Sequence, residues 1–193
     1  MNNQWYEIVD ADRPLTQGDI IANCPIVTWE AGNLALKGSL EAEVLSNAII
    51  SIIADVVVMT QACDLEQNKV PNVILCSHIS LSEYKKDWEA EMKNRTQNPT
   101  DKAWKAQCDG ICDGFIWNFS MINECKLGKQ NIETRIVDFR EVFNLPRQFL
   151  ESLLQQRNVP RFRLLPPYRE HLSQAFARFF MRVGLPVSIA KKW

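Results

Sequence analysis

The sequence predicts an α+β protein in which a small bent or barrel-like sheet precedes a polar helical insertion and two C-terminal helices. Three patterns indicate this class. Short apolar runs bounded by turn residues fill residues 1–80, residues 81–110 are polar and helical, and two amphipathic segments that begin at prolines end the chain. With 193 residues, 46% of them apolar, one domain with a substantial core is expected.

Two buried-type strands are predicted at residues 56–61 and 73–79. Two apolar strands joined by a polar connection could pair as neighbours. The connection between them, residues 62–72, is long for a hairpin and is therefore a candidate to carry function.

Weaker signals precede these strands. Gly18-Asp19 indicates a turn, and Pro25 suits an edge strand because it lacks a backbone donor. Residues 41–45 form a further candidate strand. Residues 49–53 fit a strand or a buried helix, and periodicity alone does not decide between them.

The insertion is predicted to contain helices at 82–95 and 100–107, separated at Asn98-Pro99. Trp88 and Trp104 are its isolated apolar anchors, and together with Trp193 they look exposed. Asp109 and Asp113, each followed by glycine, look like turn residues.

A β-hairpin is expected within residues 111–140, from strand-like alternation at 115–122 and 132–139 with a turn at 127–131. Helices are expected at 146–156, with proline in the first turn, and at 166–184, which ends at a glycine. They fill most of the C-terminal region, residues 141–193.

The net charge of −1 hides an asymmetry. Residues 157–193 hold eight basic residues and one acid, while the preceding residues hold 14 basic and 22 acidic ones. Either a basic layer packs beside an acidic body, or the C-terminal region presents a basic surface to nucleic acid, phosphate or an acidic partner.

No secretory signal pattern opens the sequence, and the longest apolar region, residues 48–59, is shorter than the roughly 20 residues that span a bilayer. The sequence therefore predicts a cytoplasmic protein without membrane association. In that setting its six cysteines are expected to be reduced thiols.

The segment TQACDLE, residues 60–66, places a thiol and polar side chains directly after the strand at 56–61. One hypothesis is a catalytic site formed by Cys63, Asp64 and Gln61 together with His78, because a nucleophilic thiol needs a base. The competing readings are small-residue packing at a strand end and polar scaffolding that satisfies loop amides.

Metal chemistry has weaker signals. Cys108, Cys112 and Cys125, with Cys76 and His78, lack the paired C-x2-C spacing of a zinc site, and incidental cysteines explain them as well. Four acids at predicted strand ends could gather around a divalent cation, but no motif fixes their spacing: Asp19, Asp55, Asp64 and Glu66. No glycine-rich phosphate loop is present, and neither cofactor nor metal is expected.

A candidate anion site lies at the start of the last predicted helix. Free N–H groups of a helix N-terminus attract anions, and arginine binds phosphate or carboxylate in a bidentate manner. The alternative is local pairing of Arg169 with Glu170. The candidate residues are Arg161, Arg163, Tyr168, Arg169 and His171.

The order GDI at 18–20, VVVMTQ at 56–61 and VILCSHI at 73–79 resembles the first strands of PemK/MazF-type toxin domains. That resemblance implies an SH3-like barrel and ribonuclease chemistry. The chain departs from the pattern at ACDLE, at His78 and in its long C-terminal region. As a whole, with TQACDLE and LLPPYREHLSQAFARFFMRVGLP, it looks like a group of bacterial proteins from variable genomic regions, which implies no mechanism.

Three functional hypotheses follow. The leading one is a non-catalytic binding or accessory protein with a protein partner, in a bacterial defence setting such as a toxin–antitoxin or phage-defence system. The second is a PemK-like enzyme, a ribonuclease-type hydrolase that contacts nucleic acid through the basic C-terminal region. The third is a zinc-stabilised binding module.

Overall fold

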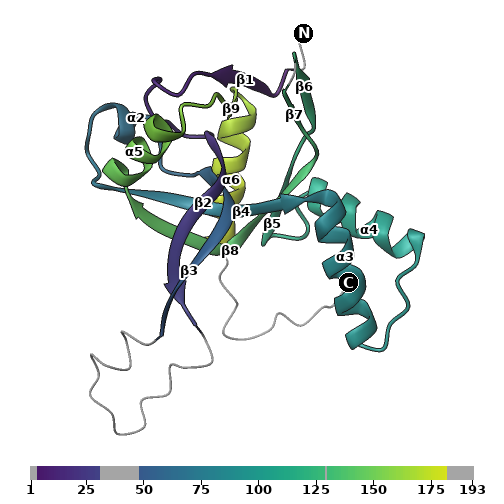
Figure 1. Ribbon diagram of the computed structural model, residues 1–193. Coiled ribbons are helices and arrows are strands. Elements are labelled where there is room, and N and C mark those ends of the chain that lie inside the picture. Colours follow the sequence, from purple (N-terminus) through teal and green to yellow (C-terminus); the bar gives the residue numbers. More distant parts are fainter. Residues whose placement is uncertain (1–3, 31–47, 129, 182–193) are drawn as a thin grey trace, which may run out of the picture.

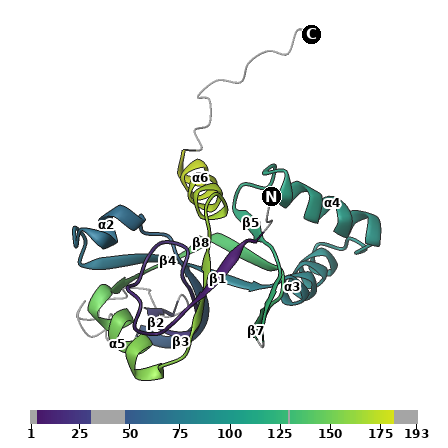
Figure 2. The ribbon, with the colours of Figure 1, turned by 90° about the horizontal axis from the view of Figure 1, so that it is seen from above.

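The computed structural model describes residues 4–30, 48–128 and 130–181 and confirms the α+β class (Figure 1). Its main sheet is antiparallel and has the strand order β2-β3-β4-β8-β5. These strands are β2 (Ile20–Trp29), β3 (Ile49–Val58), β4 (Asn72–Ser80), β8 (Arg135–Pro146) and β5 (Phe119–Ile122). The sheet is curved, as the two views at right angles show (Figures 1 and 2).

The predicted neighbours at 56–61 and 73–79 do pair, as β3 and β4, with Val56 opposite Ser77. β3 begins at Ile49, so the ambiguous run 49–53 is strand. It ends at Val58, earlier than predicted, and the connection to β4 contains the short helix α2 (Ala62–Glu66). The candidate strand 41–45 lies outside the described residues.

A second, two-stranded ribbon was missed by sequence reasoning. It consists of β1 (Tyr6–Val9) and β9 (Arg161–Leu164), which pair although about 150 residues separate them. β9 lies between the two C-terminal helices, where the sequence predicted no strand. A bridge between Asp19 and Arg163 joins this ribbon to the start of β2.

β5 and β8 pair as the predicted hairpin requires, but the segment between them forms a smaller hairpin of its own. That hairpin consists of β6 (Cys125–Leu127) and β7 (Gln130–Ile132). β8 also runs on to Pro146, so residues 141–146 are strand rather than part of the C-terminal helical region.

The helical insertion consists of α3 (Leu81–Asn94) and α4 (Asp101–Cys112). A capping box at Ser80 begins α3, and the Thr100 side chain caps α4. Asp109 is helical, which corrects the predicted turn there; the turn comes at Gly114, whose φ is +73°.

Trp88 and Trp104 are half-buried and lie against each other, with ring centroids 5.3 Å apart. Trp104 also contacts Tyr84. These tryptophans therefore form the insertion's own core, which corrects their exposed appearance in the sequence. Trp193 lies outside the described residues.

The two C-terminal helices cover opposite faces of the sheet. α5 (Arg147–Arg157) inserts Leu150 and Leu154 into one core, together with Val56, Val58 and Leu75. α6 (Tyr168–Phe180) inserts Leu172 into a second core that includes Tyr6, Val57 and Phe139. Successive residues of a strand face opposite sides, so both cores are built from the same strands.

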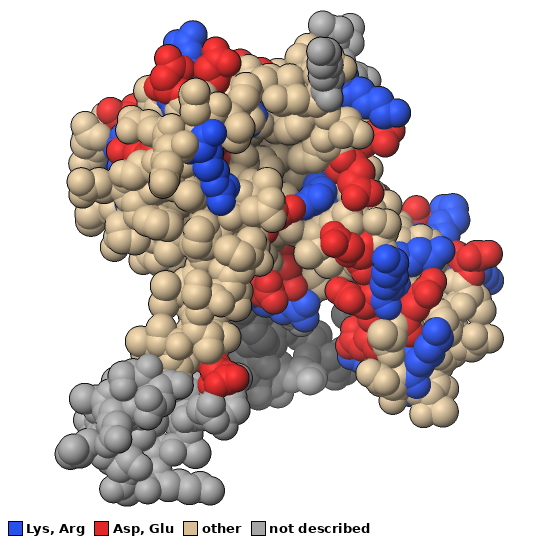
Figure 3. Space-filling view, in the orientation of Figure 1, with Lys and Arg blue, Asp and Glu red and all other residues tan. Residues whose placement is uncertain are grey.

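The ends of β2 and β3 form an arm that projects from the body on the side away from the β1–β9 ribbon (Figure 1). Charged side chains gather on the helical insertion and on the top of the body, whereas the described part of the arm is largely uncharged (Figure 3). No described helix is long and apolar enough to cross a membrane.

Two arginines hold a fully buried carboxylate between the sheet and the ribbon. Asp19 has no exposed surface, and Arg161 Nε donates to its Oδ2 at 2.9 Å while Arg163 Nε donates to Oδ1. Arg161 also donates to the carbonyl oxygens of Asp10, Arg13 and Pro14. This arrangement supports the intramolecular explanation for these two basic residues.

Asp19→Asn should lower the free energy of unfolding by about 3 kcal/mol, because it leaves two arginines without their buried charge partner. Urea denaturation measures the change. Asp12→Asn is the matched control, since Asp12 is exposed and should change stability by less than about 0.5 kcal/mol. Equal effects of the two substitutions would contradict a central role for Asp19.

Candidate functional site

The TQACDLE segment forms a turn that is anchored to the sheet at both ends. The Thr60 hydroxyl accepts a hydrogen bond of 2.7 Å from the amide of Ile74. Leu65 is fully buried in the core that α5 covers, which we call the α5-side core. Between these anchors Cys63 is exposed. Its sulfur lies 3.7 Å from Gln61 Oε1 and 3.8 Å from Asp64 Oδ1. The structure thus brings together three of the predicted catalytic residues.

His78, the fourth predicted catalytic residue, lies elsewhere. The chain before α2 bonds to β4 at Ile74, where the amides of Met59 and Thr60 donate to its carbonyl. His78 is four residues further along β4, about 13 Å away at the usual rise of a strand. Its side-chain neighbours are Arg135 and Asp55 instead of Cys63.

The end of α2 borders a cavity of about 730 Å³, which we call the arginine groove. It lies between α2, the β1–β9 ribbon and the start of α6, and Arg13, Arg147, Arg163 and Arg169 line it with Glu66. Sequence reasoning placed Arg163 and Arg169 in an anion site, and the structure brings them to the rim of the TQACDLE turn.

Most of these guanidiniums already have partners. Arg147 donates to the Leu65 carbonyl and to Asn68, both at 2.6 Å, and Arg169 pairs with Glu170. Arg163 holds Asp19. Among the described residues, the exposed guanidinium of Arg13 makes no hydrogen bond or ion pair.

The remaining predicted anion residues separate from the groove. Arg161 is buried against Asp19. Tyr168 and His171 line a different cavity of about 330 Å³, where the Tyr168 ring stacks on Trp5 at 4.0 Å between centroids. The predicted anion site is therefore divided between three places.

His78 belongs to a cluster of three side chains across adjacent strands, which we call the imidazole cluster: Asp55 on β3, His78 on β4 and Arg135 on β8. Arg135 Nε donates to His78 Nδ1 at 2.9 Å, and Arg135 Nη2 donates to Asp55. A bulge in β2 supports the cluster, because Asn23, at φ +50°, donates its amide to Asp55 Oδ1 at 2.8 Å.

Burial and the adjacent Arg135 guanidinium lower the pKa of His78 to about 3, against smaller upward effects of Asp55 and the Val56 carbonyl. The imidazole is therefore neutral at physiological pH. Since Nδ1 accepts a hydrogen bond, the imidazole proton lies on Nε2. Nε2 is buried and makes no hydrogen bond within the part of the chain that the structure describes.

Sequence reasoning missed Arg135 and the role of Asn23. Arg135 lies 57 residues after His78, and their proximity depends on the pairing of β4 with β8. Asp55 was considered only as one of four acids. Those acids do not gather, since Asp19 and Asp55 are held by arginines and Asp64 and Glu66 lie on α2.

The cysteines named as metal candidates are spread over several elements. Cys108 and Cys112 lie on α4, Cys125 on β6 and Cys76 in the sheet. Among the described residues, no three side chains of histidine, cysteine, aspartate or glutamate approach closely enough to hold a metal ion.

No family model matches the chain, and a search of the curated proteins finds no match to its sequence.

Histidine titration tests the imidazole cluster. Below pH 6.5 the unfolded chain binds a proton at residue 78 that the folded protein does not bind until about pH 3. His78 should therefore make stability fall with falling pH in this window, by about 1.4 kcal/mol per pH unit. His78→Gln should remove this slope in urea denaturation, and His171→Gln, which changes the other histidine, should leave it. Parallel curves for wild type and His78→Gln would contradict the assignment.

Alkylation tests the exposure of the TQACDLE thiol. Iodoacetamide should modify Cys63 in the folded protein, because it is exposed. Cys24 and Cys76 should resist, since both are buried and burial raises their pKa values to about 11 and about 12. Mass spectrometry locates the modified residues, and denatured protein, in which all six cysteines react, is the control. Equal rates at Cys63 and Cys76 would contradict the geometry.

Proposed function

We propose that this protein is a non-catalytic binding protein that acts as an accessory subunit by docking an extended segment of a protein partner on the β2–β3 arm. The observation that carries the proposal is an uncharged, exposed apolar face on this arm. Cross-strand partners lie on the same face of a sheet, and three such pairs form it: Pro25 with Ile53, Val27 with Ser51, and Trp29 with Ile49.

Four of these side chains are well exposed: 65% for Val27, 51% for Trp29, 49% for Ile49 and 62% for Ile53. The opposite face of the arm contains Ile26, which is fully buried in the α5-side core. The arm is therefore fixed to the body by one face and presents the other. Contiguous apolar surface of this kind is typical of interaction sites, and tryptophan is a frequent interface anchor.

The edge of β2 favours an extended partner. β2 is an outer strand of the sheet, and Arg157 occupies its edge only at the bulge, where it donates to the carbonyl oxygens of Ala22 and Asn23. Beyond Asn23, no described strand pairs with the outer edge of β2. Backbone pairing by an added strand, with apolar side chains on the exposed face, suits this geometry.

The enzyme alternative receives less support. Cleavage by Cys63 and His78 requires both at one bond, but Cys63 lies on α2 and His78 lies on β4, and their side chains have different neighbours. An imidazole with a pKa of about 3 is also a poor general base at neutral pH. The bacterial defence setting, toxin–antitoxin systems included, rests on the family resemblance alone.

Affinity capture from the native host tests the proposal. A tagged wild-type chain should retain a stoichiometric protein partner at high salt, because apolar contacts resist screening. Trp29→Asp should weaken retention at least about tenfold. Val159→Asp is the matched control, since Val159 is 54% exposed in the α5–β9 connection and should keep the partner.

Circular dichroism establishes that both variants fold. If Trp29→Asp and Val159→Asp lose the protein partner to the same extent, the docking assignment is wrong. It is also wrong if the capture recovers only nucleic acid and this nucleic acid is released as the salt concentration rises. The second outcome would move attention to the basic C-terminal region.

A further inference from the structure

Two thiols and a thioether come together where the end of α4 meets β5, and we call this set the sulfur cluster: Cys108, Cys112 and Met121. Cys112 Sγ lies 3.6 Å from Met121 Sδ. Cys108 lies one helical turn before Cys112, on the same side of α4. Met121 packs against the insertion's core, which includes Ile111 of α4, so apolar packing fixes the approach of the two elements.

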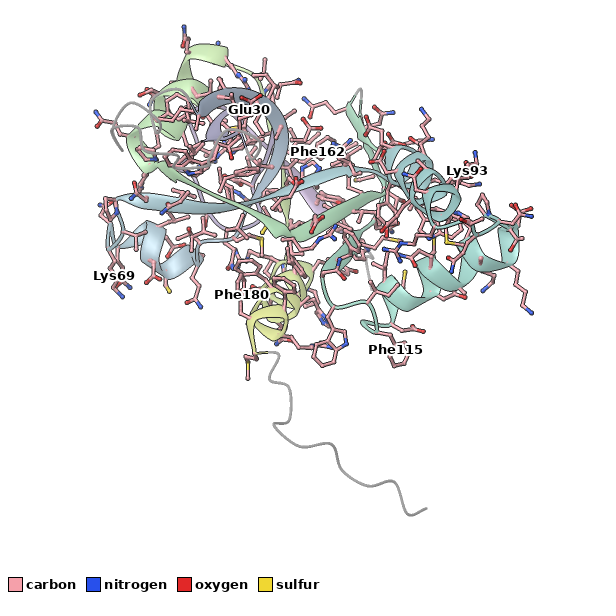
Figure 4. All side chains as sticks on the ribbon, turned by 90° about the horizontal axis from the view of Figure 1, so that it is seen from below. Glu30, Lys69, Lys93, Phe115, Phe162 and Phe180 are labelled. Carbon is pink, nitrogen blue, oxygen red and sulfur yellow. The ribbon has the colours of Figure 1, made fainter. Side chains whose placement is uncertain are left out.

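The sulfur cluster is accessible from the surface. Cys112 is exposed, and Cys108 and Met121 are half-buried. Cys112 and Met121 also line the cavity of about 330 Å³ that His171 lines from α6. Figure 4 labels Phe115, which projects outward from the turn between α4 and β5. An ion can therefore reach these sulfurs without a change of fold.

The spacing of the sulfurs suits a shared metal ion better than a disulfide. Side chains four residues apart on a helix have Cβ atoms about 5–6 Å apart. A disulfide holds its Cβ atoms at about 3.8 Å, so a bond between Cys108 and Cys112 would distort α4. A metal ion about 2.3 Å from each sulfur accommodates the larger separation. The 3.6 Å between Cys112 and Met121 also fits two ligands of one such ion, with an angle of about 100° between the two bonds.

The ligand types select a soft ion. Structural zinc is held by four ligands drawn from cysteine, histidine and carboxylates. Among the residues that the structure describes, no third side chain of these types joins Cys108 and Cys112. Thiolate and thioether ligands together select Cu(I), which is softer than zinc. Because one of its three ligands is a methionine, the sulfur cluster differs from the zinc sites considered for the cysteines of this chain.

The charges around the sulfur cluster favour a cation with a high affinity for sulfur. Burial raises the pKa of Cys112, and the neighbouring Asp113 and Asp109 add to this increase. Burial also raises the pKa of Cys108, followed by the effect of the adjacent Cys112. Both thiols therefore keep their protons at neutral pH, and a metal ion must displace them. The two aspartates attract a cation to the same place.

We propose that the sulfur cluster binds one Cu(I) ion through Cys108 Sγ, Cys112 Sγ and Met121 Sδ. As the two thiolate–copper bonds form, both thiols release their protons to the solvent. The thioether donates a lone pair, and the oxidation state of the copper does not change. The bound ion links α4 to β5 across the turn that joins them.

Competition with the chromogenic chelator bicinchoninate tests this site. Cu(I) is added in the absence of oxygen to the reduced full chain together with the chelator, and the loss of colour measures the copper that the protein holds. The wild-type chain should withdraw about one equivalent of Cu(I) from the chelator. An excess of Zn(II) should not displace the bound copper, because zinc gains little from the thioether.

Substitution of single ligands assigns the binding to the sulfur cluster. Cys108→Ser, Cys112→Ser and Met121→Leu should each weaken Cu(I) binding at least about tenfold, which is the effect that even the loss of an indirect partner has at a metal site. Cys63→Ser and Met92→Leu are the matched controls and should bind as wild type does. Cys63 is an exposed thiol on α2, and Met92 is a half-buried methionine on α3.

Stoichiometric copper binding that survives Cys112→Ser overturns the proposal, and so does an equal affinity of Met121→Leu and Met92→Leu. X-ray absorption of the copper-loaded wild type should show three sulfur neighbours, and nitrogen neighbours in their place would also overturn the assignment. Circular dichroism establishes that each variant folds. Trp29→Asp should bind Cu(I) unchanged, which keeps this test independent of partner docking.

Discussion

The turn at residues 16–19 and its buried carboxylate connect the main sheet to the β1–β9 ribbon. Gly18 donates its amide to the Val58 carbonyl in the main sheet and accepts from the Leu164 amide in the ribbon. Its φ of +83° and the approach of Leu164 and Arg169 leave little room for a side chain there. Asp19 then draws Arg161 and Arg163 from β9 onto the same point. The second core, which contains Leu164 and Leu172, depends on this joint.

Arginine serves as a connector throughout the fold. Arg147 fixes the loop after α2, Arg157 covers the carbonyl oxygens of the β2 bulge, and Arg135 joins β8 to β3 and β4. A guanidinium has several donors in a fixed plane, so one side chain can satisfy two or three acceptors that strand ends and bulges leave unpaired. Much of the positive charge that looks available in the sequence is therefore used inside the molecule.

The two ends of the molecule have different characters. Figure 4 shows Lys69, next to α2, and Lys93, on α3, at opposite ends of the body. The insertion has its own aromatic core and carries dense surface charge, while the TQACDLE turn is fixed by Thr60 and Leu65. The apolar face of the arm lies apart from both ends. It is built from β2 and β3 beyond the bulge at Asn23, where Cys24 and Ile26 face the core and Val27 and Trp29 are exposed.

The sequence by itself determined the α+β class, the β3–β4 pair, the helical insertion and the approximate positions of α5 and α6. Apolar period, proline and glycine act over a few residues, so these features can be found locally. It also identified Cys63 with Gln61 and Asp64, which are neighbours in the chain. Only the tertiary structure decided which acid each arginine meets, because β1 pairs with β9 and β4 with β8 across long separations. For the same reason His78 joined Arg135 and Asp55, since the contacts of a side chain in a sheet are set by strand order and register.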